Sequence, residues 1–372
     1  MFAEVNEYEM REEKDNRSLN QRFAADQNRM RDSQSFFESD PNFADLIRRY
    51  QPVKTPSKLY HYTDHSGLLG IIQSKTLWAT HFEYTNDATE VIHGIGVALK
   101  QLELAVSQTD SSDVEYKVED YLLDKVPNSK PSDALVQVAL ATLRVPQIER
   151  KSSYEFFFAC LSEHGDQLSQ WRAYARDATG FAVGLSGDVL RNQFVLGQLR
   201  DENSGDTVDV LKVIYDSKAQ AEIVATWISC MCKRFDDMIP GLPVECHRDA
   251  FLKANTWLIA SLIGLALHFK HPGFVEEDEW RIIFCKYDCD RSESRKCIPI
   301  QTRSNPSGVI PYVALPLCPP QEELALEHLI VGPKRSARPG STPSAFGIDT
   351  LCSSLVGGAP KLGIGRSEIP YC

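Results

Sequence analysis

The stretch Phe269-Lys-His-Pro-Gly-Phe-Val-Glu-Glu-Asp-Glu-Trp-Arg-Ile-Ile-Phe284 joins an acidic run to an apolar strand. The acidic residues at 276–279 stand directly before the run 280–284, which is typical of a buried strand. Like charges raise one another's pKa, so carboxylates crowded at the start of an apolar strand require a cation or a functional use. Arg281, on the same strand, can pair with one of them.

Short strands and helices alternate on both sides of this stretch. We expect strands at 59–63, 76–82, 156–161, 180–185, 211–215, 280–284, 308–315, 328–332 and 369–371, and helices at 66–74, 132–144, 167–175 and through most of 216–270. We also expect 211–215 to pair with 180–185. The spacing is not that of regular β-α-β units. The sequence therefore predicts an α+β fold with a mixed, mainly antiparallel sheet and helical insertions.

The domain organisation follows from composition. Residues 1–51 are rich in charged and amide side chains and poor in aliphatic ones, which predicts a mobile polar arm. Pro52 and Pro56 then break the chain before the first strand. We expect residues 52–372 to form a single domain with insertions near 105–150 and 216–270.

The totals exclude several classes of protein. The 372 residues carry a formal net charge of -11, which disfavours general affinity for nucleic acid. The longest apolar run, 256–269, is too short to cross a bilayer, so we expect a soluble cytoplasmic protein without a membrane partner.

The ten cysteines are scattered and form no C-x-x-C pair, which indicates reduced thiols. A zinc site built from Cys285, Cys289 and Cys297 with Cys246-His247 is an alternative. Its spacing matches no standard zinc pattern. We therefore predict no metal.

A series of short motifs suggests a family. In chain order the motifs are Tyr60-His-Tyr-Thr63, Leu77-Trp78, Asn86-Asp87-x-x-Glu90, Cys160-Leu-Ser-Glu163, Trp171-x-x-Tyr174-Ala175, Gly180-Phe-Ala-Val183, Lys270-His271, Glu277-x-Glu279-Trp280-Arg281 and Ile330-Val-Gly-Pro333. Over about residues 58–372 the chain resembles the bacterial "domain of unknown function 2971" family. It departs from that family in placing Tyr84-Thr85 before Asn86-Asp87 and in ending on Pro-Tyr-Cys.

The order of elements is similar to that of the ADP-ribosyltransferase fold. In that fold a His contacts a ribose of NAD, a Tyr stacks on nicotinamide, and a Glu stabilises the ribose as nicotinamide departs. A carboxylate fixed in a dry site binds the positively charged transition state better than the ground state. The stacked aromatic holds the leaving group in a reactive orientation.

The resemblance implies a role for particular residues. The implied catalytic residues are Glu279, with Glu277 on the acceptor side, and His61. The implied NAD-binding residues are His61, Tyr62, Thr63, Trp171, Tyr174 and Arg281. Glu327, which also precedes a late strand, is a rival to Glu279, and Tyr84 is a weaker choice for the stacking aromatic.

Each assignment has a structural alternative. His61 can simply bond a backbone carbonyl, the acidic run can be a solvated loop paired to Arg281, and Trp171 and Tyr174 have the spacing of core residues. A Cys160–His164 dyad, and a carboxylate pair formed by Glu163 and Glu279, are other catalytic arrangements.

These expectations lead to one functional hypothesis and two alternatives. We expect an NAD-using ADP-ribosyltransferase-like enzyme of the bacterial cytoplasm, acting as a toxin, effector or antiviral defence component, with NAD as a substrate. Its acceptor, protein or nucleic acid, is not identified. The alternatives are a non-catalytic module that binds a nucleotide or a protein, and a nuclease. Fold alone does not decide between them.

Overall fold

The structure is a computed structural model, and it describes residues 49–52, 54–85, 88–108, 121, 123, 126, 129–145, 154–194, 207–287, 298–305, 308–318, 324, 326–333 and 363–370. The chain divides into two compact units. Among the described residues, unit 1 holds those of His93–Ser153 and Lys218–Ala266 with Arg49 and Tyr50, and unit 2 holds the others. The polar arm expected at 1–51 falls almost wholly outside the described residues.

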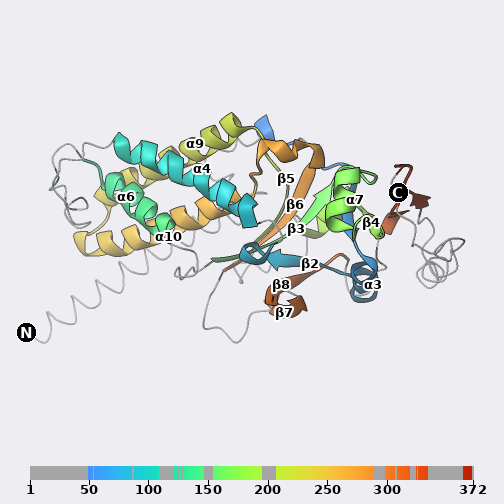
Figure 1. Cartoon of the computed structure of the whole chain (residues 1–372). Coiled ribbons are helices and arrows are strands. Elements are labelled where there is room, and N and C mark those ends of the chain that lie inside the picture. The colour runs from blue at the N-terminus through green and yellow to red at the C-terminus, as the bar shows by residue number, and fades with distance from the viewer. Residues whose placement is uncertain are drawn as a thin grey trace, which may run out of the picture. The chain divides into compact units, whose positions relative to one another are not determined.

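Unit 1 is helical (Figure 1). Its elements are α4 (Ala88–Ser107, from His93 on), α6 (Pro131–Arg144), α9 (Ser217–Met238, from Lys218 on), η3 (Ile239–Gly241) and α10 (Val244–Ala266). Two polar contacts join these helices, the first partly buried and the second buried. Asp236 accepts hydrogen bonds from the backbone and side chain of Ser132, at 2.9 and 2.8 Å. The indole of Trp227 donates to Ser261 Oγ at 2.7 Å.

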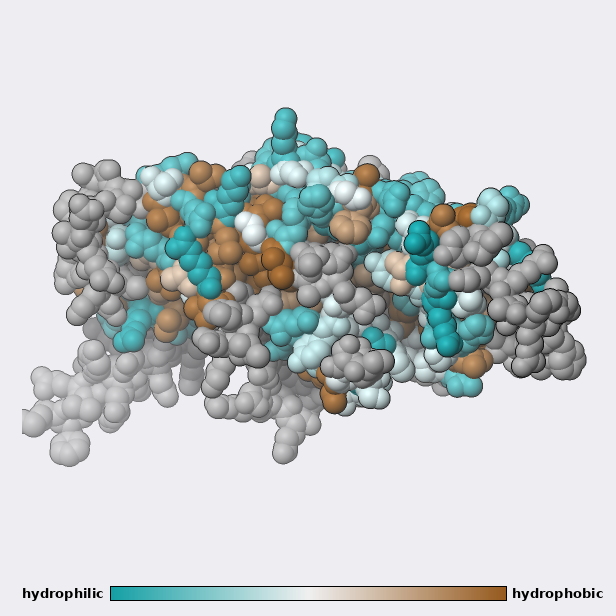
Figure 2. Space-filling view, viewed as in Figure 1, coloured by the Kyte–Doolittle hydropathy of each residue, from teal (hydrophilic) through white to brown (hydrophobic). Residues whose placement is uncertain are grey.

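The surface of unit 1 retains apolar side chains. Figure 2 shows them gathering over the helices of this unit, and Leu104 of α4 is 48% exposed. By contrast, α10 is buried along most of its length. Among the described helices, none is both long enough and apolar enough to span a membrane.

The crossing of α4 and α10 depends on a glycine. A Cβ placed on Gly94 would lie 2.3 Å from the carbonyl oxygen of Ala266, far inside a normal contact. Since that oxygen belongs to the backbone, a side chain at 94 would force the two helices apart. Gly96, on the same helix, has open space around it.

Unit 2 contains a ten-stranded sheet. The strands are β1 (Lys58–Thr63), β2 (Thr76–His81), β3 (Tyr154–Ser162), β4 (Phe181–Ser186), β5 (Thr207–Lys212), β6 (Glu279–Tyr287), β7 (Ile300–Asn305), β8 (Gly308–Pro316), β9 (Leu326–Val331) and β10 (Gly363–Arg366). Their main order is β10-β9-β4-β1-β3-β2-β8-β7, with β6 on β3 and β5 on β6. Every pair is antiparallel except β9 with β10.

The sheet divides at β3. Along its whole length β3 pairs with β6. Elsewhere β3 meets β1 only at Ser162, opposite Tyr60, and meets β2 only at Phe157 and Phe158. The positions between these pairings, 159–161, therefore face the point where the β1 and β2 branches separate. Backbone groups there are open to partners other than a strand.

Short helices complete unit 2: α3 (His65–Ser74), η1 (Phe82–Tyr84), α7 (Leu168–Tyr174), α8 (Gly187–Phe194) and η4 (Pro272–Glu277). Asp64 caps α3, because its Oδ1 accepts a hydrogen bond from the amide of Gly67 at 2.8 Å. Strand alternation gives the sheet two apolar faces. A large core includes Phe157, and a smaller one packs Tyr62 against Trp171.

The sequence prediction of a mixed, mainly antiparallel sheet with helices is confirmed. The strand predicted at 211–215 lies earlier in the chain, as β5 at Thr207–Lys212, and its predicted pairing with 180–185 is wrong because β5 pairs with β6. The polar strand β7 and the glycine-rich β10 were not predicted. Ile369 and Pro370 lie outside any strand. The single domain over 52–372 stays a prediction.

The Gly94 contact gives a matched pair of variants on one helix. We expect Gly94→Ala to destabilise the protein by about 1–3 kcal/mol, because the new methyl overlaps the α10 backbone. Gly96→Ala should stabilise it by about 0.5–1 kcal/mol through helix propensity. Urea unfolding followed by circular dichroism measures both. Equal effects at the two positions would contradict the close helix crossing.

Candidate functional site

Four charged side chains lie together in the interior of unit 2, and we call them the charge network: Lys270, Glu277, Glu279 and Arg281. None is more than 7% exposed. Lys270 Nζ contacts Glu277 Oε2 at 2.5 Å and Glu279 Oε2 at 2.9 Å. Arg281 Nε contacts the other oxygen of Glu279 at 2.7 Å. Two cations thus balance two carboxylates, as buried charges require.

The backbone places these groups with little freedom. Glu277 ends η4, and Asp278, in the left-handed conformation with a φ of 45°, links it to β6. Glu279 and Arg281 are two residues apart on β6, so both side chains point to the same face of the sheet. Arg281 Nη1 also donates to the carbonyl of Leu267, just after α10, at 2.6 Å.

Aromatic rings enclose the charge network. The guanidinium of Arg281 lies 4.8 Å from the ring centre of Phe158, and Lys270 Nζ lies 5.0 Å from that of Phe274. Tyr215 accepts a hydrogen bond from the amide of Glu279 at 3.0 Å. Tyr174 of α7 is half-buried and interacts electrostatically with the network, and burial raises the pKa of its hydroxyl.

The two carboxylates respond to burial in opposite ways. Burial raises the pKa of Glu277, and its single contact with Lys270 offsets only part of that effect. Burial would likewise raise the pKa of Glu279, but Arg281, Lys270 and hydrogen bonds, including one from the Cys160 thiol, lower it below its ordinary value. Glu279 therefore stays ionised to a lower pH than Glu277, which is the more easily protonated of the two.

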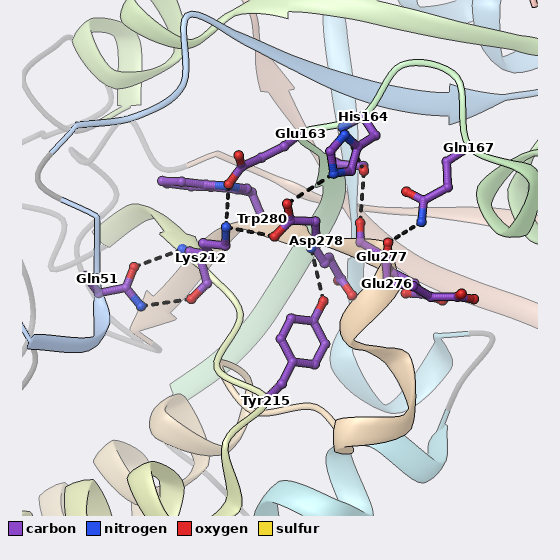
Figure 3. Close-up of polar contacts among 12 residues, drawn as sticks. Gln51, Glu163, His164, Gln167, Lys212, Tyr215, Glu276, Glu277, Asp278 and Trp280 are labelled. Atoms are coloured by element: carbon purple, nitrogen blue, oxygen red, sulfur yellow. Dashed lines mark hydrogen bonds and ion pairs between the residues drawn. The ribbon is translucent and has the colours of Figure 1, made fainter.

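A second polar layer fastens the loop after β3 to the turn before β6 (Figure 3). Lys212 Nζ contacts Glu163 Oε1 at 2.6 Å and Asp278 Oδ1 at 2.7 Å. The indole of Trp280 donates to the same Glu163 oxygen at 2.8 Å. His164 Nε2 lies 3.2 Å from the other carboxylate oxygen of Asp278. These contacts hold η4, and with it Glu277, against the end of β3.

His61 reaches the division in the sheet. Its Nδ1 lies 2.9 Å from the carbonyl oxygen of Cys160 on β3. Because a carbonyl only accepts, Nδ1 carries the proton. Burial lowers the pKa of His61, and the Arg303 charge lowers it further, against the effect of this hydrogen bond. The neutral ring then presents Nε2 as a hydrogen-bond acceptor.

Cys160 connects the two residues to which the resemblance gives central roles. Its carbonyl oxygen receives the His61 hydrogen bond, and its thiol donates to the carboxylate of Glu279. His61 and Glu279 are thus brought to one residue of β3 from separate strands. The structural alternative for His61 was a hydrogen bond to a backbone carbonyl. His61 Nδ1 makes such a bond, and Nε2 is left to accept a hydrogen bond from a ligand.

Other residues implied by the resemblance are engaged in the fold. Tyr62 donates to the carbonyl of His164 at 2.7 Å and accepts from the amide of Gln167 at 3.1 Å. Thr63 is buried against α3. Trp171 is completely buried and donates to Asp166 at 2.7 Å, so its ring faces the core. Of the two stacking candidates on α7, Trp171 and Tyr174, only Tyr174 keeps some exposure.

The remaining alternatives are placed apart from the charge network. Glu327 on β9 interacts electrostatically with Tyr60, on the β1 branch. Cys160 bonds Glu279 rather than His164, whose ring contacts Asp278. Cys289 and Cys297 lie outside the described residues, and the described ones include no group of three His, Cys, Asp or Glu able to hold a metal ion.

Lys270 is the residue that sequence reasoning missed. From the sequence it had no role beyond a family motif, but the lysine lies after the end of α10 at Ala266 and is 1% exposed between two carboxylates. The sequence does contain a signal for this role. Lys270 stands seven residues before Glu277 and nine before Glu279, and Arg281 alone cannot balance the charge of two carboxylates. The solvated-loop alternative holds for Glu276, which is exposed, and is wrong for Glu277 and Glu279.

Comparison with known proteins identifies one family. The family described as "Protein of unknown function (DUF2971)" matches residues 170–282, from α7 to the middle of β6. Residues 170–282 are thus similar to the DUF2971 family. This matched segment includes the whole charge network. No curated protein and no solved structure matches the chain.

The lowered pKa of Glu279 predicts how stability depends on pH. A carboxyl group with a depressed pKa in the folded state stabilises the fold above its ordinary value of 4.5, and this is lost as the pH falls through the folded-state value. We expect Glu279→Gln to cost about 3–5 kcal/mol at pH 7, because two buried cations lose a partner. The deficit relative to wild type should shrink below about pH 4.5.

Urea unfolding between pH 7 and pH 3 measures this deficit. Glu276→Gln, at an exposed position of the same acidic run, is the matched control and should leave stability unchanged. A deficit that stays constant down to pH 3, or one no larger than that of the control, would show that Glu279 is not held ionised by its neighbours.

Proposed function

We propose that this protein is an NAD-using enzyme of the ADP-ribosyltransferase type. In this reaction the bond between the ribose C1′ and the nicotinamide nitrogen breaks, and nicotinamide leaves with the bonding electrons. An acceptor nucleophile then bonds to C1′ and releases its proton. The acceptor is a protein, a nucleic acid or another molecule, and the family resemblance described above motivates the choice of reaction.

The observation that supports this proposal most directly is the state of His61. Its Nδ1 is fixed by the Cys160 carbonyl, so the ring keeps one orientation and one tautomer. The Nε2 lone pair can accept a hydrogen bond from a ribose hydroxyl. The ring stays neutral at physiological pH because its pKa is lowered, first by burial. A group oriented before the ligand arrives loses little entropy on binding.

The charge network supports a role for a carboxylate rather than for a carboxylic acid. Glu279 remains ionised at neutral pH, which suits a group that stabilises positive charge developing on ribose. Tyr174 lies within electrostatic range of the network and is half-buried, so it is the better candidate for the ring that stacks on nicotinamide.

A specific observation favours a second candidate function. Lys270 and Arg281 already occupy both oxygens of Glu279, and its side chain is 4% exposed. A carboxylate neutralised in this way stabilises a transition-state cation less than a bare one would. A module that binds a nucleotide without turnover would use the His61 acceptor and keep the charge network as a structural element. The nuclease alternative gains no support from the net charge of -11.

Binding of NAD tests what both candidates share. We expect NAD at about a hundredfold over its dissociation constant to stabilise the wild type by roughly 2.7 kcal/mol, which raises the thermal midpoint by several degrees. His61→Ala should abolish the shift. His65→Ala, which removes an exposed imidazole from α3, is the control and should retain it. Absence of a shift at millimolar NAD in the wild type would contradict an NAD site.

Release of nicotinamide separates turnover from binding. We expect Glu279→Gln to lower the rate of nicotinamide release, with water as acceptor, by at least about a hundredfold, as loss of a transition-state contact does. Glu327→Gln should leave the rate within a factor of about three. The NAD-induced thermal shift of each variant verifies that the site is still formed. Loss of release only in Glu327→Gln would assign the catalytic carboxylate to β9, and no release from wild type would favour the binding module.

A further inference from the structure

Arg303 of β7 forms an ordered cation site on unit 2. Its guanidinium carbon lies 5.3 Å from the ring centre of Trp78 on β2 and 5.8 Å from that of Tyr312 on β8. Its Nη2 donates to Thr80 Oγ1 at 2.9 Å. The two aromatic rings contact each other, with centres 4.6 Å apart at 35°. Three strands therefore fix the position of one guanidinium.

The pairing register explains this arrangement. Thr80 lies opposite Tyr312 in the β2–β8 ladder, and Arg303 lies opposite Ile310, two residues before Tyr312, in the β7–β8 ladder. Diagonal neighbours on one face of a sheet are within reach of long side chains. The Tyr312 hydroxyl donates to Gln301 at 2.7 Å, which holds its ring against the sheet.

The cation is not neutralised by the part of the chain that the structure describes. No described carboxylate pairs with Arg303, whereas Arg281, Lys270 and Lys212 all contact carboxylates. The Arg303 side chain is only half-exposed, and burial lowers its pKa. A partly desolvated guanidinium without a counter-ion attracts an anion, and its fork of donors suits phosphate or carboxylate.

The neighbouring indole indicates which anion. Trp78 is 40% exposed although it is a large aromatic residue, and its ring adjoins the guanidinium. An exposed indole is a surface on which a flat heterocycle stacks. A phosphate and a flat ring within one small molecule describe a nucleotide. An acidic peptide would satisfy the cation but would leave the indole uncovered.

We propose that Arg303 and Trp78 form a nucleotide site in which Arg303 binds a phosphate and Trp78 stacks on the base. The choice of ligand class rests on the proposed function, because NAD contains both groups. The Arg303 charge also acts on His61, whose pKa it lowers. Tyr312 and Thr80 act as positioning residues that hold the guanidinium.

Calorimetric titration of the full chain with ADP tests this site, because ADP has phosphates and a base but no nicotinamide. We expect ADP to bind the wild type and to bind Arg303→Gln at least tenfold more weakly, the loss of a charge-assisted hydrogen bond. Arg303→Lys should fall between them, since it keeps the charge without the fork. Arg172→Gln, on the exposed surface of α7, is the control and should bind as wild type.

A second variant separates stacking from charge. Trp78→Leu should weaken ADP and adenosine at least fivefold and leave inorganic pyrophosphate unchanged, while Arg303→Gln should weaken ADP and pyrophosphate. Thermal midpoints verify that each variant is folded. The proposal is overturned if ADP does not bind at millimolar concentration, if Arg303→Gln binds it as wild type, or if pyrophosphate binding alone depends on Arg303.

The outcomes for the two proposals are distinguishable. Binding of ADP that requires Arg303, without nicotinamide release from NAD, would leave this site standing and the transferase proposal without support. Binding and turnover of NAD that require His61 and Glu279 but not Arg303 would do the reverse.

Discussion

The balance of charge inside unit 2 is the constraint on which much of its structure depends. Lys270 and Arg281 share the oxygens of Glu279, and Lys270 also contacts Glu277. Removing charges from water is costly, so each member is tolerated only because the others are present. The network also joins the segment after α10, the η4 turn and β6, the strand that pairs with β3.

The division of the sheet at β3 gives this network a functional context. Where β1 and β2 separate, the carbonyl of Cys160 receives a side chain instead of a strand amide, and that side chain is His61. The opposite edge of β3 pairs fully with β6, which carries Glu279 and Arg281. A strand with one irregular and one regular edge thus connects a neutral imidazole to buried ionised groups.

Two arginines of the sheet, Arg281 and Arg303, have different surroundings. On β6 the guanidinium of Arg281 lies between Glu279 and the ring of Phe158, and its charge is balanced. On β7 the guanidinium of Arg303 lies over Trp78 and Tyr312, with a hydroxyl as its polar partner. The first arrangement stabilises a fold, whereas the second is suited to an external anion. Fold class alone would not distinguish them.

Local patterns in the sequence determined the main elements of this protein. Apolar runs such as 156–161 and 280–284 predicted strands, because such signals act over a few residues. Family motifs directed attention to His61 and Glu279. The partner of β5, the strands β7 and β10, and the burial of Lys270 were decided by tertiary structure. Strand pairing and charge burial join residues far apart in the chain, and such long-range contacts leave no periodic signal in the sequence.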